Sequence, residues 1–385
     1  MIVGHWPISL LNSKKANAMT NIPILDDIME ISPGWISKIL NAQSEFSDCQ
    51  VIDLTRENLN QDAGFVSQLV RLRLRYDEKP PSAPSSIIVK LAPKDAATKE
   101  FGIALALFQR EVGFYRHFAQ DNPCNPPRPY HADISDNADA FNIVIEDLGA
   151  HDPEIMLEGA TAEEAHMVLT ALGGLHAKYW KRENLGSHDW IPDSAMMAPA
   201  LVGMANQVIP GFLDRFGDGM SVELRSALDE ARGAYGELIE LAAKNPNQTL
   251  CHTDTHLGNI VFQGGKPRFL DWQAFMIQSF SYDLAYFLNG NLMPSIRRKN
   301  QEALLDTYFE ALNQGGVSDV SRDEVTLAYN REAAGQLVTI PLIAGAFLTD
   351  DERGHTLAAA WLPRFYAAME DSDAPKQLAD LLADA

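Results

Sequence analysis

The sequence predicts an α+β protein organised as two lobes, on three observations. The chain of 385 residues is long enough to bury two sizeable cores, as two or three domains or as one large two-lobed unit. Two segments with strand-like pattern, 65–76 and 86–91, occur in its first third. Amphipathic helical segments dominate the chain after residue 160. We therefore expect an N-terminal lobe with an antiparallel sheet and a mostly helical C-terminal lobe.

Composition and charge limit the classes of partner. The formal net charge of −21 at pH 7 argues against nonspecific binding to nucleic acid or to an anionic membrane surface. No stretch approaches the roughly 18–20 uninterrupted apolar residues of a membrane span, and the N-terminus lacks the pattern of a signal peptide. Cys49, Cys124 and Cys251 lie far apart in the chain, so they predict neither disulfides nor a zinc site. We expect a cytoplasmic protein.

The first lobe is expected to follow a poorly packed tail over residues 1–20. Ser32-Pro33-Gly34 is a helix-entry signal before a short amphipathic helix. In segment 65–76 apolar residues alternate with arginines, which predicts a strand with one wet face. Segment 86–91 is predicted to return beside it, so that the two strands form a hairpin.

Lys90 lies in the second of these strands, on the face opposite its apolar neighbours Val89 and Leu91. A lysine that ends an apolar strand is usually a solvated edge charge. Here a helix is predicted over 99–120, and it carries two candidate partners for the ammonium group, Glu111 and Glu100.

The central stretch of the chain, 250–273, carries a predicted metal site. Two short apolar runs flank the turn-rich segment 263–267, which predicts a hairpin about Gly265. In that register Asn259 falls opposite Asp271, and facing residues of a ladder lie about 4.5–5.5 Å apart at Cα. An amide oxygen beside a carboxylate, with room left for water and phosphate oxygens, suits Mg2+.

Asp254 lies five residues before Asn259, close enough to share the site without being a ligand. A carboxylate beside a metal–phosphate centre can accept the proton of an attacking hydroxyl. A base, two hard metal ligands and a strand lysine are the groups that phosphoryl transfer requires.

The pattern H-x-D-x-x-x-x-N over 252–259, followed by D-W after the hairpin, resembles the catalytic segment of aminoglycoside phosphotransferases and choline kinases. The resemblance is closest to the bacterial ecdysteroid-kinase-like branch, where the metal aspartate is often followed by an aromatic residue and Gln, as in D-W-Q at 271–273. One departure is Thr253, where the family usually has Gly. A β-branched residue restricts the backbone, so we expect this loop to be shifted slightly.

The resemblance implies a two-lobed protein-kinase-like fold, with a nucleotide-binding N-lobe over 21–147 and a C-lobe over 148–385. It implies that ATP and Mg2+ bind between the lobes and that the phosphoryl group passes to a hydroxyl of a small molecule. In this family a strand lysine paired with a helix glutamate holds the α- and β-phosphates, which are the roles implied for Lys90 and Glu111 in the motif E-x-x-F-Y.

Further site residues are implied only by the resemblance. Backbone groups of Glu146 and Leu148, where the chain crosses between lobes, are expected to bond adenine. Gly64 is expected in the loop over the phosphates, although this loop lacks the several glycines of a kinase phosphate loop. Asp254 is implied as the catalytic base, and Asn259 and Asp271 as the Mg2+ ligands.

The C-lobe is predicted to consist mainly of helices. A capping box of Thr161 and Glu164 opens the first of them, and Asp283 stands at a plausible N-cap of another. The remaining helices are predicted over 210–243, 297–312, 322–347 and 357–369, with breaks at Gly335 and Pro341.

Two other interpretations of the central motif remain. His252, Asp254 and His256 could form a metal cluster of the kind found in zinc hydrolases. Alternatively, the protein could bind nucleotide without turnover, as the glycine-poor phosphate loop and Thr253 would allow. The identity of the phosphate acceptor does not follow from the sequence.

Overall fold

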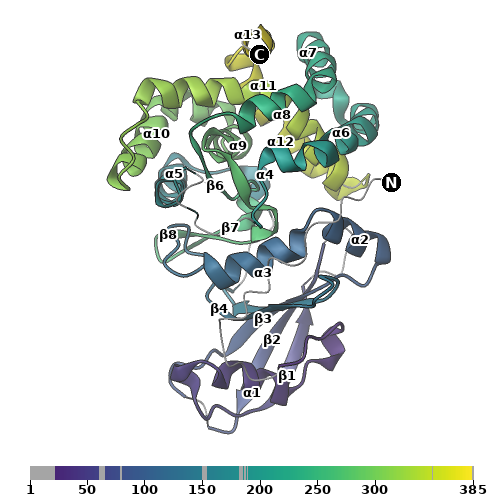
Figure 1. Ribbon diagram of the computed structural model, residues 1–385, viewed down its shortest axis with the longest axis vertical. Coiled ribbons are helices and arrows are strands. Elements are labelled where there is room, and N and C mark those ends of the chain that lie inside the picture. Colours follow the sequence, from purple (N-terminus) through teal and green to yellow (C-terminus); the bar gives the residue numbers. More distant parts are fainter. Residues whose placement is uncertain are drawn as a thin grey trace. The chain divides into compact units, whose positions relative to one another are not determined.

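The computed structural model describes residues 22–59, 66–78, 80–149, 154–181, 185, 188, 190–348 and 350–383. The predicted tail over 1–20 and Gly64 lie outside these described residues. The chain divides into two compact units (Figure 1). The first comprises residues 1–150 together with Asp271–Ala274, and the second comprises 151–270 and 275–385.

The first unit is built on a five-stranded antiparallel sheet of order β1-β2-β3-β5-β4. Its strands are β1 (Val51–Asn58), β2 (Gln68–Tyr76), β3 (Ser86–Leu91), β4 (Pro129–Ile134) and β5 (Phe141–Glu146). The predicted hairpin of β2 and β3 is confirmed, with Gln68 paired to Leu91 and Arg73 to Ser86. The wet face of β2 is confirmed too, because its arginines form ion pairs with acidic side chains of β1.

The helices of the first unit differ in one respect from the sequence prediction. They are α1 (Pro33–Asn41), α2 (Ala96–Ala104) and α3 (Leu107–His117), with short 3-10 turns at Ile28–Glu30, Ser44–Phe46 and Trp272–Ala274. Ser32 caps α1 as predicted. The single helix predicted over 99–120 is wrong, because Ala106 adopts a left-handed φ of 54° and separates α2 from α3. Phe108 then folds back against Gly102 of α2.

Packing on the two faces of the sheet decides where Lys90 points. Apolar side chains of α1 form one core with Val89 and Leu91. Because side chains alternate along a strand, Lys90 lies on the opposite face. On that face Phe108 of α3 packs on Phe141 of β5, with ring centroids 4.9 Å apart.

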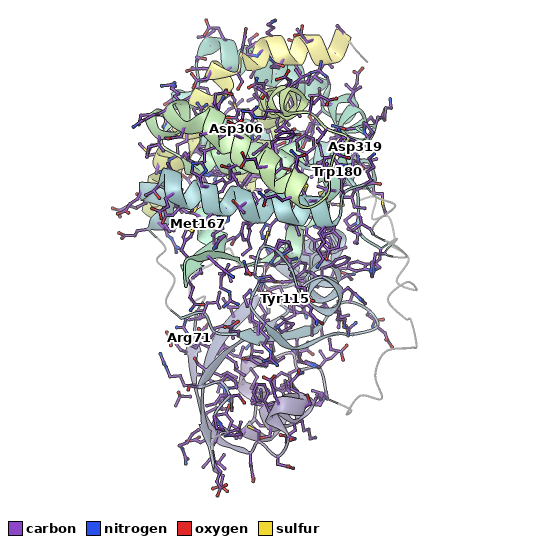
Figure 2. All side chains as sticks on the ribbon, turned by 90° about the vertical axis from the view of Figure 1, so that its left-hand side faces the viewer. Arg71, Tyr115, Met167, Trp180, Asp306 and Asp319 are labelled. Atoms are coloured by element: carbon purple, nitrogen blue, oxygen red, sulfur yellow. The ribbon has the colours of Figure 1, made fainter. Side chains whose placement is uncertain are left out.

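The second unit is mostly helical. Its helices are α4 (Ile155–Glu158), α5 (Ala162–Lys178), α6 (Ser194–Phe216), α7 (Val222–Gly233), α8 (Tyr235–Ala243), α9 (Ser281–Asn291), α10 (Pro294–Gln314), α11 (Arg322–Phe347), α12 (Glu352–Asp371) and α13 (Ala374–Ala383), with 3-10 turns at Gly217–Gly219 and Leu257–Asn259. The Thr161–Glu164 capping box of α5 is confirmed. Beyond the C-terminal end of α5, Trp180 Nε1 donates to Asp319 Oδ1 at 2.9 Å (Figure 2).

Two helix predictions in this unit need correction. The helix expected to begin at Pro210 begins at Ser194, and Pro210 lies inside it. Pro341 and Gly335 do not break α11, because packing on its neighbours offsets the cost of an interior proline. By length and hydropathy alone the stretch Ser194–Gly219 could cross a membrane. This helix contains two prolines, and such a test is weak evidence because the core helices of soluble proteins also pass it.

Two small antiparallel sheets carry the central motif. They pair β6 (Gln248–Cys251) with β9 (Met276–Ser279), and β7 (Ile260–Gln263) with β8 (Lys266–Phe269). The predicted hairpin exists, but its register is shifted by one residue. Gly264 and Gly265 form a two-residue turn with φ of 61° and 74°, as a type I′ turn requires. Ile260 therefore pairs with Phe269, and Asn259 lies opposite Leu270 rather than Asp271.

Candidate functional site

A buried ion cluster forms in the first unit around Lys90. Its Nζ donates to both carboxylate oxygens of Glu111, at 2.7 and 2.8 Å, and to Oδ1 of Asp271 at 3.0 Å. The side chains of Lys90 and Glu111 are 9% and 3% exposed, whereas Asp271 is 31% exposed. Of the two candidate partners, the structure thus joins Glu111 to Lys90, while Glu100 is exposed on α2.

The charges in this cluster depend on one another. Burial alone would lower the pKa of Lys90, but the charges of Asp271 and Glu111 outweigh it and raise the pKa. Burial raises the pKa of Glu111 to about 7, against the opposing charge of Lys90. The ammonium group therefore stays protonated, and it holds two carboxylates that would otherwise repel each other.

The segment that carries Asp271 is attached to α3. The indole of Trp272 stacks on the ring of Phe114, with centroids 3.9 Å apart and planes 6° apart. Arg110 donates from Nη1 to the carbonyl of Ala274 at 3.0 Å. Asp271 itself has a φ of 55°, in the left-handed region that costs a non-glycine residue roughly 1–2 kcal/mol. These contacts place the Asp271 carboxylate beside Lys90.

The turn after β5 bears the residues implied in adenine binding. Asp147 accepts hydrogen bonds from Arg71 Nε and from the backbone N–H of Gly149, both at 2.9 Å. The backbone N–H of Glu146 donates to the carbonyl of Arg128 at 2.9 Å. In the part of the chain that the structure describes, no protein group bonds the backbone N–H of Leu148, so that donor is available to a ligand.

The second unit holds Asp254 on the loop between β6 and β7. Its Oδ2 accepts Asn259 Nδ2 at 2.9 Å, and its Oδ1 accepts the hydroxyl of Tyr286 at 3.3 Å. His256 Nε2 lies 3.5 Å from Oδ2. Burial opposes ionisation of Asp254, but the charge of His256, with smaller effects of the charge of His252 and the hydrogen bond from Asn259, outweighs burial and lowers the pKa of Asp254 to about 2. The side chain is 28% exposed, so an ionised carboxylate remains accessible.

Asn259 is oriented by the same loop. Its Nδ2 donates to both the side chain and the backbone carbonyl of Asp254. Its Oδ1 has no partner within the described residues, which leaves this oxygen for a cation. Oδ2 of Asp271 likewise has no partner in the described parts of the chain. Asn259 and Asp271 belong to different units, so the metal site that they would share stays a prediction.

Asp283 holds the backbone of the loop between β6 and β7. It accepts the N–H of His252 at 2.7 Å and that of Thr253 at 2.8 Å, and its Oδ2 also lies 3.2 Å from His176 Nε2. The N-cap predicted at Asp283 is wrong, because α9 begins at Ser281. Its predicted structural role is supported, since all its contacts are with buried groups.

Thr253 shows how this loop accommodates a departure from the family pattern. Thr253 adopts a φ of 67°, in the left-handed region that glycine favours, and the expected shift of the loop stays a prediction. A left-handed non-glycine residue costs roughly 1–2 kcal/mol, and the hydrogen bond to Asp283 helps to offset that cost. The residue is 8% exposed.

Comparison with known proteins supplies the family. The model of the ecdysteroid kinase-like family matches residues 61–317. The chain belongs to the ecdysteroid kinase-like family. The bacterial branch named above remains a prediction. No curated protein sequence matches the chain.

Solved structures of similar fold are distant in sequence from this family member. They include a choline kinase from Cryptosporidium parvum Iowa II, with 14% identity over 92% of this chain and 96% of that one, at a TM-score of 0.51. A choline/ethanolamine kinase family protein from Mesorhizobium loti has 17% identity over 90% and 97% of the two chains, at a TM-score of 0.45. The choline kinase likeness confirms the predicted two-lobed, protein-kinase-like fold. Family membership and fold support a small-molecule kinase, an ATP-dependent phosphotransferase acting on a hydroxyl group, whose substrate is not identified.

The geometry of this ecdysteroid kinase-like site argues against zinc. His252 Nε2 hydrogen-bonds the carbonyl of Leu270 at 2.8 Å, and its Nδ1 accepts the N–H of Asp254 at 3.2 Å. Both ring nitrogens are therefore engaged with the protein. A second group, His176, Cys251 and Asp283, brings potential ligand atoms together. Asp283 already accepts two backbone N–H groups, which marks this group as structural.

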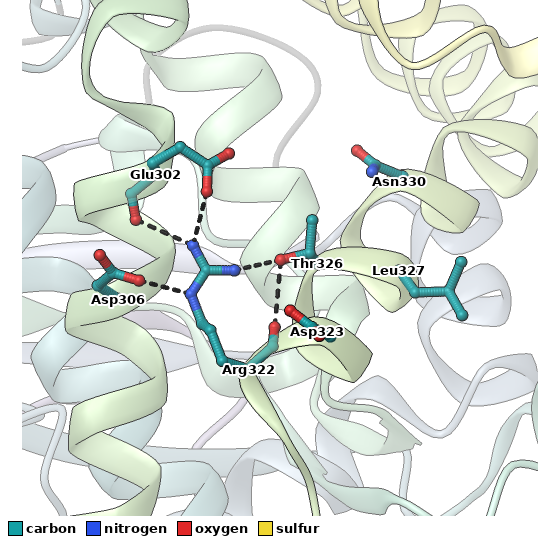
Figure 3. A pocket seen from close by; sticks show the side chains of 7 residues that line it. All are labelled: Glu302, Asp306, Arg322, Asp323, Thr326, Leu327 and Asn330. Carbon is teal, nitrogen blue, oxygen red and sulfur yellow. Dashed lines mark hydrogen bonds and ion pairs between the residues drawn. The ribbon is translucent and has the colours of Figure 1, made fainter.

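A depression of about 490 Å³ on the second unit is also structural (Figure 3). At its centre the guanidinium of Arg322 bonds Glu302, Asp306 and Thr326. These contacts tie α11 to α10 and leave the arginine fully engaged.

Sequence reasoning missed Tyr286 as a neighbour of Asp254. The residue follows Asp283 by three positions in α9, so both side chains lie on one face of the helix. That spacing was the available signal, but only the packing of α9 against the loop shows that this face meets Asp254.

Proposed function

We propose that the protein transfers the γ-phosphoryl group of ATP to a hydroxyl of a small molecule, with Asp254 as the base. The observation that carries this proposal is the accessible, ionised carboxylate of Asp254 bonded to Asn259. It is joined in the chain to a segment that places Asp271 on Lys90.

On the nucleotide side, the proposed N-lobe over 21–147 provides Lys90 for the α- and β-phosphates. Glu111 holds its ammonium group in place. The backbone groups of Leu148 and Glu146 are proposed to bond adenine, and Gly64 to belong to the loop over the phosphates.

The metal proposed is Mg2+, with Asn259 Oδ1 and a carboxylate oxygen of Asp271 as ligands. Both are hard oxygen donors, which fit this ion, and Asn259 Oδ1 is left without a protein partner in the described residues. When bound, the ion would neutralise charge on the transferring phosphates.

In the proposed step the acceptor hydroxyl oxygen attacks the γ-phosphorus in line. A P–O bond forms, and the bond from the γ-phosphorus to the ADP oxygen breaks with its electron pair leaving on ADP. Asp254 takes the proton of the hydroxyl through one carboxylate oxygen. It later returns that proton to water.

The second candidate function, a nucleotide-binding scaffold without turnover, has less support. Loss of Lys90, Asp254, Asn259 or Asp271 would mark an inactive kinase, and all four are present. We propose a cytoplasmic location, since none of the three cysteines forms a disulfide and disulfides are rare in that compartment.

The test is a paired measurement on Asp254→Asn, which keeps the size of the side chain but removes its basic carboxylate. Because Asp254 is proposed to contact the acceptor rather than ATP, calorimetry should show nearly unchanged ATP affinity. Phosphotransfer to the best acceptor of a hydroxyl panel should fall by about 10²–10⁴-fold.

Asp306→Asn, which changes a 59% exposed carboxylate, is the matched control and should transfer phosphate like the parent. A parental rate in Asp254→Asn would rule out Asp254 as the base. A parent that binds ATP but phosphorylates nothing in the panel would favour the scaffold.

A further inference from the structure

Tyr286 of α9 contacts Asp254, which lies on the loop between β6 and β7. Its hydroxyl donates to Asp254 Oδ1 at 3.3 Å, while Asn259 donates to Oδ2 at 2.9 Å. Each carboxylate oxygen thus receives one neutral donor from a different element, α9 or the turn at Leu257–Asn259. The mechanism above assigns no role to the tyrosine.

The phenol is held in one position by the packing around it. Tyr286 is 1% exposed. Trp361 and Phe365 of α12 meet its ring edge-on, at centroid distances of 6.1 and 5.7 Å. Tyr282 stacks on it at 6.1 Å with planes 11° apart. A ring packed on three sides keeps its hydroxyl directed at Asp254.

The hydroxyl also acts as a donor throughout the working range of pH. Burial and the charge of Asp254 raise the pKa of Tyr286 well above its usual value, so the phenol stays protonated. Asp254 Oδ1 is the only hydrogen-bond partner of this hydroxyl in the described chain. The contact is therefore a donor aimed at one oxygen.

We infer that Tyr286 is a positioning residue for the phosphoryl-transfer reaction, holding the Asp254 carboxylate at the angle that meets the acceptor hydroxyl. The inference rests on the proposed function, in which Asp254 is the base.

The physical reason lies in the torsion of the aspartate side chain. The terminal torsion of Asp is broad, so a single donor on one oxygen would let the carboxylate swing about that contact. Two donors, one on each oxygen, fix the plane of the group. The remaining lone pair on each oxygen then points to a constant place, and positioning errors near 1 Å can cost about 10²-fold in rate.

Tyr286→Phe tests the inference because it removes one hydroxyl and keeps the packed ring. We expect kcat for phosphotransfer to fall by about 10–100-fold while KM for ATP stays within twofold of the parent value. In a thermal-unfolding cycle, the stability loss of Tyr286→Phe should largely disappear on an Asp254→Ala background, where its partner is absent.

Tyr329→Phe is the matched control. It too removes a buried phenol that donates within this unit, to Asn289 Oδ1 at 2.7 Å, but it touches no atom of Asp254. It should lose stability without losing kcat. A kcat of Tyr286→Phe within twofold of the parent, or a loss of kcat equal to that of Tyr329→Phe, would overturn the inference.

Asp254→Asn distinguishes failure of the positioning role of Tyr286 from failure of the proposed function. If Asp254→Asn abolishes transfer and Tyr286→Phe does not slow it, only the positioning role is wrong. If Asp254→Asn transfers at the parental rate, the base assignment fails and the positioning role fails with it.

Discussion

The two groups of functional residues hold their carboxylates in different ways. In the first unit, Glu111 and Asp271 are bound directly by the ammonium group of Lys90. In the second, the carboxylate of Asp254 accepts hydrogen bonds from an amide and a phenol, and the charge of His256, whose Nε2 lies 3.5 Å away, lowers its pKa.

The difference matches what each group is proposed to do. A buried ion cluster holds the ammonium group of Lys90 in one place, where it is proposed to bind phosphates. Contacts as close as the 2.7–3.0 Å ion pairs of the first unit would occupy the oxygens of a base, whereas His256 Nε2 lies 3.5 Å from Asp254 Oδ2. Neutral donors orient Asp254 and leave it 28% exposed, so that a substrate hydroxyl can reach it. Close ion pairs suit phosphate binding, and hydrogen bonds that leave a carboxylate accessible suit proton transfer.

Replacement of Lys90 should disrupt the ion cluster that it forms with Glu111 and Asp271. In Lys90→Met we expect turnover to fall by about 10²–10³-fold and ATP affinity to weaken, since the phosphates lose their counter-charge. The protein should stay folded, because the pKa of Glu111 is already raised to about 7 and this carboxyl can bind a proton once Lys90 is gone. Steady-state kinetics, calorimetry and thermal unfolding check the three effects.

Lys94→Met is the control for this variant. Lys94 lies just beyond the same strand, but it is 59% exposed and pairs with Asp27. Its replacement should leave both affinity and turnover unchanged. Equal behaviour of the two variants would show that Lys90 does not bind the phosphates and that its ion cluster is only structural.

The two proposed metal ligands allow the units to be compared directly, since Asp271 belongs to the first unit and Asn259 to the second. Asp271→Ala should weaken the Mg2+-dependent part of ATP binding by at least about 10–100-fold, and Asn259→Ala should weaken it less. The reason is that only Asp271 brings a formal charge to the ion. Calorimetric titration with ATP, with and without Mg2+, measures this part of the affinity. A larger loss in Asn259→Ala would contradict the assignment of Asp271 as the main ligand.

Glu332 is another carboxylate in this second unit that accepts a hydrogen bond from a neutral group, and its effect on stability depends on pH. Ser281 Oγ donates to it at 2.9 Å. Burial raises its pKa to about 7, and the charge of Asp283 adds to that rise. The folded protein thus binds this proton more tightly than the unfolded chain does. The stabilisation is complete below the unfolded pKa of about 4.5 and is lost as pH rises through about 7.

Glu332→Gln should therefore stabilise the protein at pH 8, by about 1–3 kcal/mol, and give no gain near pH 4.5. Urea unfolding at the two pH values measures this. Glu324→Gln is the control, because hydrogen bonds from Ser321 lower the pKa of Glu324. That variant should show no gain at pH 8. A Glu332→Gln variant with the same stability difference at both pH values would contradict burial as the cause.

The sequence was sufficient for features that depend on short spacing. Alternation along β3 placed Lys90 on the face away from the core, and the capping box at Thr161 located the start of α5. The spacing of Asp254 and Asn259 predicted that they share one loop. These features are local, because periodicity and capping act over a few residues.

Sequence patterns failed to predict two features: the register of the β7–β8 hairpin, which is shifted by one residue, and the break between α2 and α3, which depends on the φ of Ala106. The turn could be centred on Gly265 or between Gly264 and Gly265, and the choice shifts the residue opposite Asn259 from Asp271 to Leu270. Apolar periodicity runs across Ala106, so nothing in the pattern separates α2 from α3. Both cases depend on residues with positive φ, which glycine adopts freely but Ala106 adopts only at a cost.

The sequence alone predicted which chemical groups the site contains: a base, two oxygen ligands for a metal and a lysine for the nucleotide phosphates. Only the tertiary structure decided what each group contacts. Glu111 prevailed over Glu100 because α3, not α2, faces Lys90. Tyr286 contacts Asp254 because α12 packs on α9 and α9 lies against the loop between β6 and β7. Such contacts join residues tens to hundreds of positions apart, and the side-chain packing that selects them leaves no short-range pattern in the chain.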